Sequence, residues 1–521
     1  MKSAMWKTLF AVLIFAQFAE SAKILGLFPL NGPSHWAPAK ALMEALAKKG
    51  HQVTVVTHFP RKEPLANYKE ISLAGTLPTV MNNMSYSLVG QMGLIGTAFV
   101  VWHLTGSNLC KMLYPTKQFQ DLAASNEKYD LIVTETFGTD CFLGFVHKFQ
   151  APWVSLSCAI PMDWMAHQVD IPTIPSYVPH MMTNLSDRMD FWQRVRNFLM
   201  HIFTYYGYHY VSRLPSESYM SSTFPDAPPL QILSTTPSLL LSNSHFSLTG
   251  ARPSSPAHKE VGGLHITPEP APLPQDLQKL LDGAKQGVVY FSFGSMVQSE
   301  TIPQENLQIM LDTFSRLPHL VLWKANPKNF PQGLVVPKNV VTQPWLPQRD
   351  LLAHPNIKVF VTHGGLLGTM EAVYCGVPMV GVPLYGDQIT NVKNYVRKGI
   401  ARIVFVHEIQ EKFEKSLKDV LQDVGFKQNA IKVSNQFKDR PIKPLDEAVY
   451  WTEYVIRHQG APAMRTAARY LNWFALHSID VVAFLFICIL ATLVVGICGC
   501  RLLRRCCKKI NAPPKTKIKI K

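Results

Sequence analysis

Charged residues are scarce in this chain of 521 residues, and acidic residues are the scarcer kind. Only 17% of the residues are charged and 47% are hydrophobic, which excludes an intrinsically disordered chain. Lys and Arg nevertheless outnumber Asp and Glu by 51 to 35, a formal net charge of +16, so a nucleic acid or an acidic membrane surface has to be considered as a partner. The length predicts more than one domain, because single cores rarely exceed about 250–300 residues.

Two short motifs are missing, and each absence removes a class of site. No CxxC pair exists, which argues against a structural zinc site, and the lack of a GxSxG elbow excludes a serine hydrolase. Of nine cysteines, five lie in or beside a C-terminal apolar run. The other four, Cys110, Cys141, Cys158 and Cys375, are too few and too scattered to predict a disulfide framework.

The two ends of the chain predict a membrane protein. Residues 1–22 carry Lys2 and Lys7, an apolar run and a cleavage position after Ser21, the layout of a secretory signal peptide. Residues 481–500 carry no charge and would form a helix about 30 Å long, so we predict a transmembrane helix at 479–500. The tail 501–521 has basic but no acidic residues, which places it in the cytoplasm and predicts a single-pass type I protein.

The tail also accounts for much of the net charge. Nine of the sixteen excess positive charges lie in it and one in the signal segment, which leaves +6 for the rest. The basic balance therefore indicates membrane orientation, with membrane lipid and no nucleic acid as a partner. Lys517 and Lys519 resemble a dilysine signal for the endoplasmic reticulum, although simple electrostatic anchoring is an alternative. Sequons at Asn83 and Asn184 are compatible with lumenal exposure as glycosylation sites.

Strands and helices alternate along the lumenal part. A buried strand at 23–30 is followed by a helix at 35–49 and a second strand at 52–57, and the alternation returns at 129–134 and from Val288 onwards. Such repeats predict two doubly wound Rossmann-like α/β domains. Four prolines in residues 266–274 indicate a linker between the domains, with an ordinary surface loop as the alternative. The predicted parts are an N-terminal domain at 23–265, a C-terminal domain at 275–445 and a helical segment at 446–478 leading to the membrane.

Residues 345–388 carry the strongest site pattern. A strand at 359–362 runs into His363-Gly364-Gly365 and then a helix, where backbone N–H groups and the helix dipole favour a phosphate. Glu371 lies two helical turns further on, in reach of ribose hydroxyls. Asp387 and Gln388 follow another strand at its carboxyl end.

This ordered set resembles the signature of the UDP-glycosyltransferase family, in its membrane-bound animal branch. The parts that match are Trp345-x-Pro-Gln348, Thr-His-Gly-Gly at 362–365, the acidic Glu371 and Asp387-Gln388. The resemblance covers nearly the whole chain, and details at 139–142 and 365–368 are most similar to insect members. It implies a GT-B arrangement of the two domains, with the acceptor on the N-terminal and the UDP-sugar on the C-terminal domain.

The resemblance also implies a role for each matching residue. Trp345 would stack on uracil, Gln348 would bond to the nucleoside, Glu371 to ribose, and Asp387 with Gln388 to the sugar hydroxyls. His363, Ser295 and the backbone at Gly364 and Gly365 would hold the diphosphate. Many members have Asn where this chain has Leu367, so Thr369 or backbone groups would have to serve the phosphate instead.

His35 is the candidate catalytic base. It follows the first strand at the start of a helix, where the positive end of the helix dipole disfavours an imidazolium ion. A neutral imidazole can take the proton of an acceptor hydroxyl, and it needs an acidic partner. Asp140 is favoured because the insect-like pattern places aspartate there, whereas Glu135 fills the position used elsewhere in the family.

The resemblance further implies inverting transfer of a sugar, glucose by analogy with insect members, to a hydroxyl of small lipophilic acceptors, as in detoxification. No Asp-x-Asp pair is present, which favours a mechanism with no metal and no other cofactor. Regions 80–110 and 160–210 are rich in Met and aromatic residues, which suit an acceptor pocket, a plain core or a membrane-facing surface. A homo-oligomer is possible on this sequence. The alternative function is a catalytically inactive, membrane-anchored binding protein, which the replacement of the usual Asn by Leu367 favours.

Overall fold

A computed structural model describes residues 21–90 and 93–510. The predicted signal peptide, apart from its last two residues, and the two lysines of the dilysine-like signal lie outside the described residues. The structure divides into two units, Met1–Arg465 and Thr466–Lys521.

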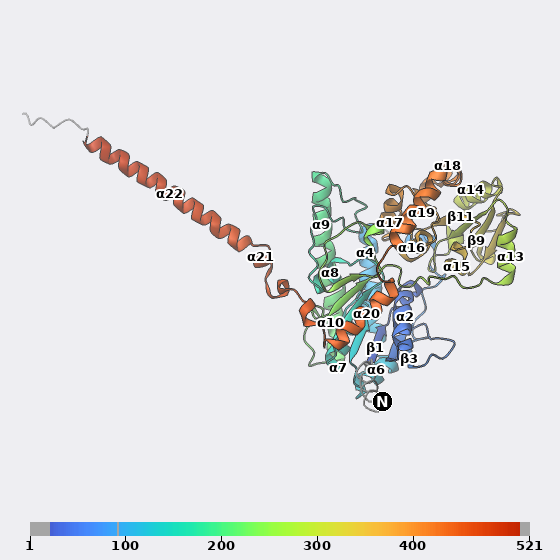
Figure 1. The fold of residues 1–521 in the computed structure, drawn as a ribbon, viewed down its shortest axis with the longest axis horizontal. Coiled ribbons are helices and arrows are strands. Elements are labelled where there is room, and N and C mark those ends of the chain that lie inside the picture. The colour runs from blue at the N-terminus through green and yellow to red at the C-terminus, as the bar shows by residue number, and fades with distance from the viewer. Residues whose placement is uncertain (1–20, 91–92, 511–521) are drawn as a thin grey trace, which may run out of the picture. The chain divides into compact units, whose positions relative to one another are not determined.

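The first unit holds two parallel sheets (Figure 1). The first has the order β3-β2-β1-β4-β5-β6-β7. Its central strands are buried throughout and mostly apolar, as in LIVT at 131–134 and LLLS at 239–242, because helices cover a parallel sheet on both faces. Its strands are β1 (Lys23–Phe28), β2 (Gln52–Thr57), β3 (Tyr68–Ser72), β4 (Leu131–Thr134), β5 (Trp153–Ser157), β6 (Leu239–Ser242) and β7 (His258–Glu260).

The second sheet has the order β10-β9-β8-β11-β12-β13. In both sheets the strand order reverses beside the first strand, between β1 and β4 and between β8 and β11. Ligands of doubly wound sheets bind at the carboxyl ends of the strands at such a switch point. The strands are β8 (Val288–Ser292), β9 (Leu320–Lys324), β10 (Val340–Gln343), β11 (Ile357–Thr362), β12 (Met379–Gly381) and β13 (Ala401–Ile403).

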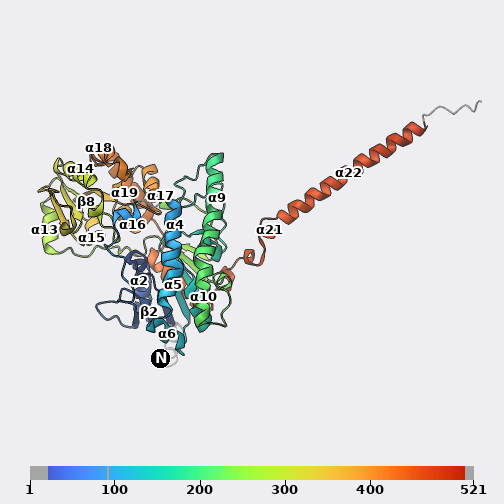
Figure 2. The same cartoon turned by 180° about the vertical axis from the view of Figure 1, so that it is seen from behind.

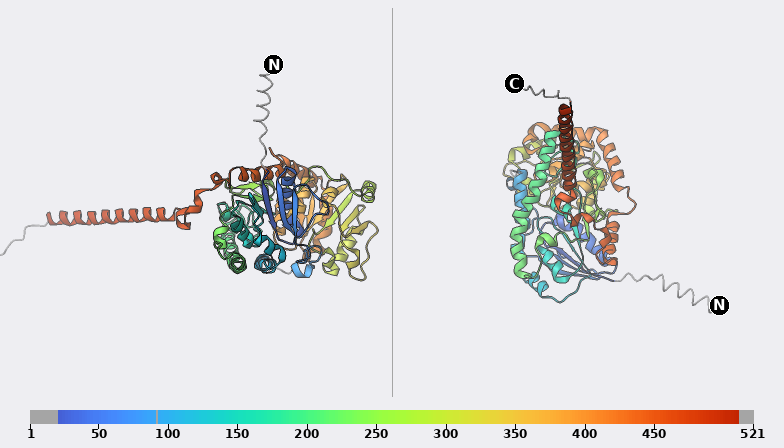
Figure 3. Two further views of the ribbon diagram at one scale, coloured as in Figure 1. Left: turned by 90° about the horizontal axis from the view of Figure 1, so that it is seen from below. Right: turned by 90° about the vertical axis from the view of Figure 1, so that its left-hand side faces the viewer.

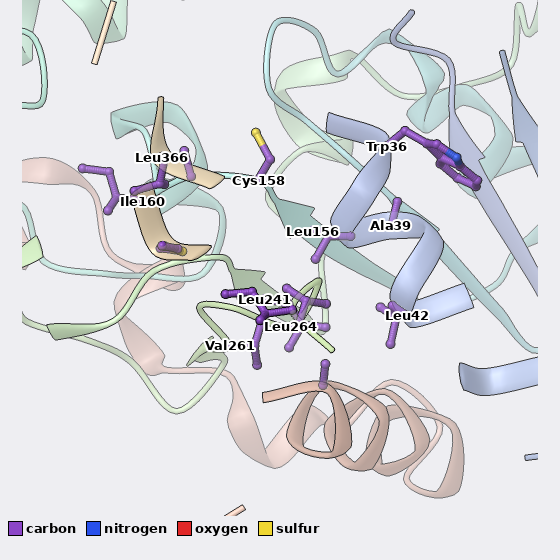
Figure 4. Close-up of a cluster of buried hydrophobic side chains, with 14 of the residues drawn as sticks. Trp36, Ala39, Leu42, Leu156, Cys158, Ile160, Leu241, Val261, Leu264 and Leu366 are labelled. Carbon is purple, nitrogen blue, oxygen red and sulfur yellow. The ribbon is translucent and has the colours of Figure 1, made fainter. Parts of the chain in front are cut away.

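Helix α20 (Pro444–Arg457) differs from the expected segment leading to the membrane. It follows the second sheet in sequence, yet it packs against β6 and α2 (Pro33–Lys48) of the first sheet. Its apolar stripe, Ala448, Val449 and Val455, is buried there, in a core shared with α2 and the end of β5 (Figure 4). Because this stripe closes the core of the first sheet, α20 belongs to the folded body, and the predicted boundary at 446 has no structural break.

A helical layer covers the first sheet on the side of α4 (Leu94–Trp102) and α9 (Phe191–Tyr208) (Figure 2). A disulfide, Cys110–Cys141, joins α5 (Asn108–Leu113) to the short 3₁₀ helix η2 (Cys141–Leu143) within this region. The sequence did not predict this bond, because two cysteines separated by 31 residues form no recognisable pattern.

The second unit contains α21 (Trp473–Leu476) and α22 (Ile479–Ile510), which is one unbroken helix (Figure 3). Residues Ile479–Cys507 form a helix long and apolar enough to cross a membrane. This helix fits the membrane anchor that the sequence predicted at 479–500.

Candidate active site

His35 and Glu135 meet at the switch point of the first sheet. The loop 29–32 joins β1 to α2, which begins at Pro33, so His35 lies in the first turn of α2, and Glu135 directly follows β4. His35 Nδ1 lies 2.9 Å from Glu135 Oε1, with both side chains largely buried at 17% and 8% exposure. Since a carboxylate accepts, His35 donates from Nδ1 and keeps the lone pair of Nε2. This is the orientation that a general base requires.

The side chains around His35 are largely apolar. The Phe137 ring lies 4.5 Å from the imidazole, centroid to centroid. Cys158 Sγ, at the end of β5, lies 3.1 Å from His35 Nδ1. Burial, together with the charge of Glu135, raises the pKa of the Cys158 thiol, so the sulfur stays protonated at neutral pH.

The preference for Asp140 as the partner of His35 is wrong in this structure. Asp140 lies beyond the loop that follows β4 and is fully buried, where its Oδ2 accepts a 2.7 Å hydrogen bond from Arg213 Nε. Arg213 belongs to the helical layer, at the end of η3 (His209–Arg213). The carboxylate of Asp140 therefore pairs with a buried cation, and Glu135 is the acid that pairs with His35.

His363 is the corresponding side chain at the switch point of the second sheet, directly after β11. Burial, and next the charge of Lys324, lower its pKa to about 4, so it is neutral near pH 7. Its Nδ1 has no hydrogen-bond partner among the described residues. Gly294 (φ 76°) and Gly365 flank the ring, and a Cβ on either would lie within 2.6 Å of it, so only glycine permits this close approach.

Helix α16 (Leu366–Tyr374) begins immediately after Gly365, with no side chain capping its first N–H groups. Gly364 (φ 90°) turns the chain into this helix, and Ser295 lies on the neighbouring loop after β8. Uncapped N–H groups at the start of a helix can hold an anion such as a diphosphate. Thr369 does not contribute, contrary to the expectation, because its buried hydroxyl bonds to Gly365 O and the Tyr395 hydroxyl inside the domain.

Glu371, on α16, and Gln348 form a half-buried polar pair. Gln348 Nε2 donates to Glu371 Oε2 over 2.7 Å, and Gln348 Oε1 accepts from the Tyr290 hydroxyl over 3.1 Å. Burial raises the pKa of Glu371 to about 7 against the lowering effect of Gln348. Trp345 is 56% exposed and leaves an indole face open for stacking.

Asp387 and Gln388 begin α17 (Gln388–Arg397) after β12. Asp387 Oδ2 accepts from Asn391 Nδ2 over 2.6 Å, and Gln388 Oε1 accepts from the backbone N–H groups of Leu384 and Tyr385. Burial raises the pKa of Asp387, while Asn391 and the charge of His35 lower it. The charge of His35, in the first domain, thus acts on the carboxyl group of Asp387 in the second.

Two groups of side chains among the described residues have metal-ligand composition. One is His35, Glu135 and Cys158, the group around the base. The other is Asp163, His180 and His201, in the helical layer. In the second group, the Met182 N–H donates to His180 Nδ1, and His201 Nε2 donates to Val178 O. These ring nitrogens are therefore already engaged in hydrogen bonds within the protein.

The Met- and aromatic-rich regions do not form one pocket. Trp164 is buried and stacks on Tyr208 with 4.4 Å between ring centroids, whereas Phe198 and Tyr206 are exposed on α9. Met84 pairs with the second sheet's domain through an isolated bridge to Val297. The predicted Met92 lies outside the described residues.

Sequence reasoning missed two polar residues of the site, Lys324 and Asn82. Lys324 is the last residue of the buried strand β9, and the rule that singled out His363, a polar side chain at the carboxyl end of a strand, would have found it. Asn82 lies in a loop of the first domain, and nothing in its local sequence indicates that it reaches the second.

Several known proteins are similar to this chain over most of its length. The sequence model of the family described as "UDP-glucoronosyl and UDP-glucosyl transferase" matches residues 78–513. UDP-glucosyltransferase 2 of Dactylopius coccus is 36% identical over 488 residues, covering 92% of this chain and 93% of that protein. UDP-glucuronosyltransferase 1A8 of Homo sapiens is 31% identical over 500 residues, covering 92% and 91%.

A solved structure described as "Crystal Structure Analysis of the Glycotransferase of kitacinnamycin" shares the fold. Its TM-score is 0.54 at 14% identity, and the likeness covers 84% of this chain and all of that one. The two parallel sheets with facing carboxyl ends thus form a GT-B fold. With a family match over most of its length and relatives that span more than nine tenths of it, the chain belongs to the UDP-glycosyltransferase family and is an enzyme that uses a UDP-sugar donor.

Proposed function

We propose that this transferase moves glucose from UDP-glucose to a hydroxyl group of small lipophilic acceptors, with inversion and without a metal ion. The observation that carries the proposal is the position of His35, which is bonded to Glu135 and whose charge acts on Asp387 of the second domain. A base at this junction lies between an acceptor bound on the first sheet and a donor bound on the second.

The proposed reaction is a single displacement. His35 Nε2 takes the proton of the acceptor hydroxyl, and Glu135 stabilises the imidazolium that forms. The acceptor oxygen attacks the anomeric carbon as the bond from that carbon to the diphosphate oxygen breaks, so UDP leaves from the opposite face. The N–H groups at the start of α16 and the neighbouring His363 stabilise the charge that develops on the diphosphate.

Donor contacts follow from the same geometry. Trp345 offers its open face to uracil, and the Gln348–Glu371 pair lies where a ribose would follow. Asp387 takes the sugar hydroxyls, with Gln388 holding the loop before it. Glucose is supported by the relative named UDP-glucosyltransferase 2, and metal independence by the lack of an Asp-x-Asp pair in the sequence.

The acceptor and the compartment are proposed on separate grounds. The Phe137 ring beside His35 favours a lipophilic acceptor. A signal segment, the apolar helix α22 and a basic tail support a type I protein of the endoplasmic reticulum membrane, with α22 spanning the lipid. The Cys110–Cys141 disulfide supports lumenal exposure of the catalytic unit, because disulfides persist in oxidising compartments.

The test is a transfer assay on membranes that contain the protein, with a panel of UDP-sugars, a mixed phenol library and detection of products by mass. The expected result is a glucoside whose formation His35→Ala abolishes while UDP still binds. His103→Ala, which changes an exposed histidine, should leave transfer unchanged. Turnover retained in His35→Ala would refute the base, and no product with any UDP-sugar would favour the inactive binder.

A further inference from the structure

A short segment of the first domain crosses to the second and pairs with its donor loop. We call residues 80–86 the strap. Val80 N–H bonds to Asn31 O, in the loop that leads into α2 and His35. Further along, Asn82 N–H donates to Ser295 O over 2.8 Å, and Met84 exchanges backbone bonds with Met296 O and Gln298 N–H. The strap therefore connects the loop of the base with the loop that follows β8.

Asn82 touches the ends of three neighbouring strands of the second sheet. Its backbone holds Ser295, after β8. Its side-chain Oδ1 accepts from Lys324 Nζ, at the end of β9, over 2.8 Å, and its Nδ2 donates to Pro344 O, after β10, over 3.3 Å. Its φ of 50° is left-handed, a conformation that asparagine tolerates better than most residues.

Lys324 is a buried cation whose hydrogen-bond partners are neutral. It is 8% exposed, and its Nζ donates to Gly294 O over 2.7 Å and to Asn82. Among the described residues no carboxylate forms an ion pair with it, and the acid that acts on it, Glu300, is bonded to the Asn326 N–H. An ammonium group has three donors, so one remains for a ligand.

The surroundings of this ammonium group favour an anionic ligand. Burying a cation without a countercharge costs free energy that an anionic ligand recovers. Burial lowers the pKa of Lys324 to about 8, and its charge in turn lowers the pKa of His363, the residue beside the uncapped start of α16. Lys324 Nζ also lies 5.2 Å from the centre of the Trp345 ring, which offers its face to a base.

We propose that Lys324 binds the diphosphate of the UDP-sugar and that Asn82 is a positioning residue that holds the Lys324 ammonium in place across the domain junction. The inference rests on the proposed donor site and adds to it a cation and a link to the first domain. Because the strap starts beside the loop of His35, donor binding through Lys324 and Asn82 stabilises the approach of the two sheets that the transfer requires.

Binding of UDP and of uridine by the full chain in detergent, measured by calorimetry, tests the role of Lys324. A charge-assisted contact to phosphate predicts that Lys324→Met weakens UDP roughly 10- to 100-fold. Uridine, which has no phosphate, should change less than about three-fold. Lys324→Arg should restore most of the UDP affinity, and Lys328→Met, an exposed lysine four residues on, should leave both affinities unchanged.

The outcomes separate this inference from the proposed function. If Lys324→Met weakens the binding of UDP and of uridine equally, Lys324 acts on the stack at Trp345 and the diphosphate role is overturned. Unchanged binding of both ligands would also overturn the diphosphate role. A wild-type chain that binds no UDP would instead refute the donor site itself.

Asn82 is tested by a double-mutant cycle on the same two ligands. Asn82→Ala should weaken UDP roughly 3- to 10-fold and raise the KM for the UDP-sugar in parallel. In the Lys324→Met background it should add less than about two-fold, because its ammonium partner is gone. Met81→Ala, an exposed neighbour in the strap, is the matched control. Fully additive effects would show that Asn82 does not act through Lys324 and would overturn the positioning role.

Discussion

At the scale of single residues, two carboxylates five positions apart have separable tasks. Glu135 holds the base His35, so Glu135→Gln should lower kcat by about 10²- to 10⁴-fold, because an amide cannot stabilise the imidazolium. Asp140 neutralises buried Arg213, so Asp140→Asn should instead cost about 3–5 kcal/mol of unfolding free energy. Steady-state kinetics on the folded fraction and thermal unfolding measure the two effects.

Asp226→Asn, which changes an exposed carboxylate of the same domain, is the control and should alter neither quantity. A loss of kcat in Asp140→Asn without any loss of stability would return the dyad to Asp140.

The same pair shows how far the sequence reaches at this scale. His35, His363 and Asp387 were predicted because each follows a strand, and parallel strands deliver such residues to one edge. The choice between Glu135 and Asp140 needed the position of Arg213, which is 73 residues further along the chain. The inward orientation of Thr369 likewise depends on Tyr395 of α17, so no local pattern could indicate it.

At the scale of elements, the disulfide between α5 and η2 is the connection that the sequence predicts least well. It closes a loop of 31 residues, which corresponds to about 3–4 kcal/mol of chain entropy removed from the unfolded state. The double variant Cys110→Ala/Cys141→Ala should therefore unfold at a markedly lower temperature, measured by scanning fluorimetry. Cys375→Ala, a free cysteine of the second domain, is the control. An equal melting temperature in the double variant and the wild type would contradict a stabilising disulfide.

The order of elements was easier to predict than their packing. Alternating strand and helix patterns predicted two doubly wound domains, because each apolar strand has to be covered on both faces. The return of α20 to the first sheet was missed, since an amphipathic stripe shows that a helix packs but not against which sheet. The strap was missed for the same reason, because its contacts with the second domain are mostly backbone hydrogen bonds that any sequence can make.

At the scale of the whole molecule, the two sequons test the proposed orientation. Asn83 is exposed, whereas Asn184 is half-buried and its Oδ1 accepts from the Thr390 hydroxyl over 3.2 Å. A lumenal catalytic unit therefore predicts one glycan, on Asn83. Endoglycosidase treatment should increase the gel mobility of the wild type and of Asn184→Gln, but not that of Asn83→Gln. In sealed microsomes, protease should remove an epitope tag at the C-terminus while residues before α22 stay protected. A protected tag together with an unglycosylated chain would contradict the proposed orientation. It would also place the catalytic unit outside the oxidising compartment in which disulfides persist.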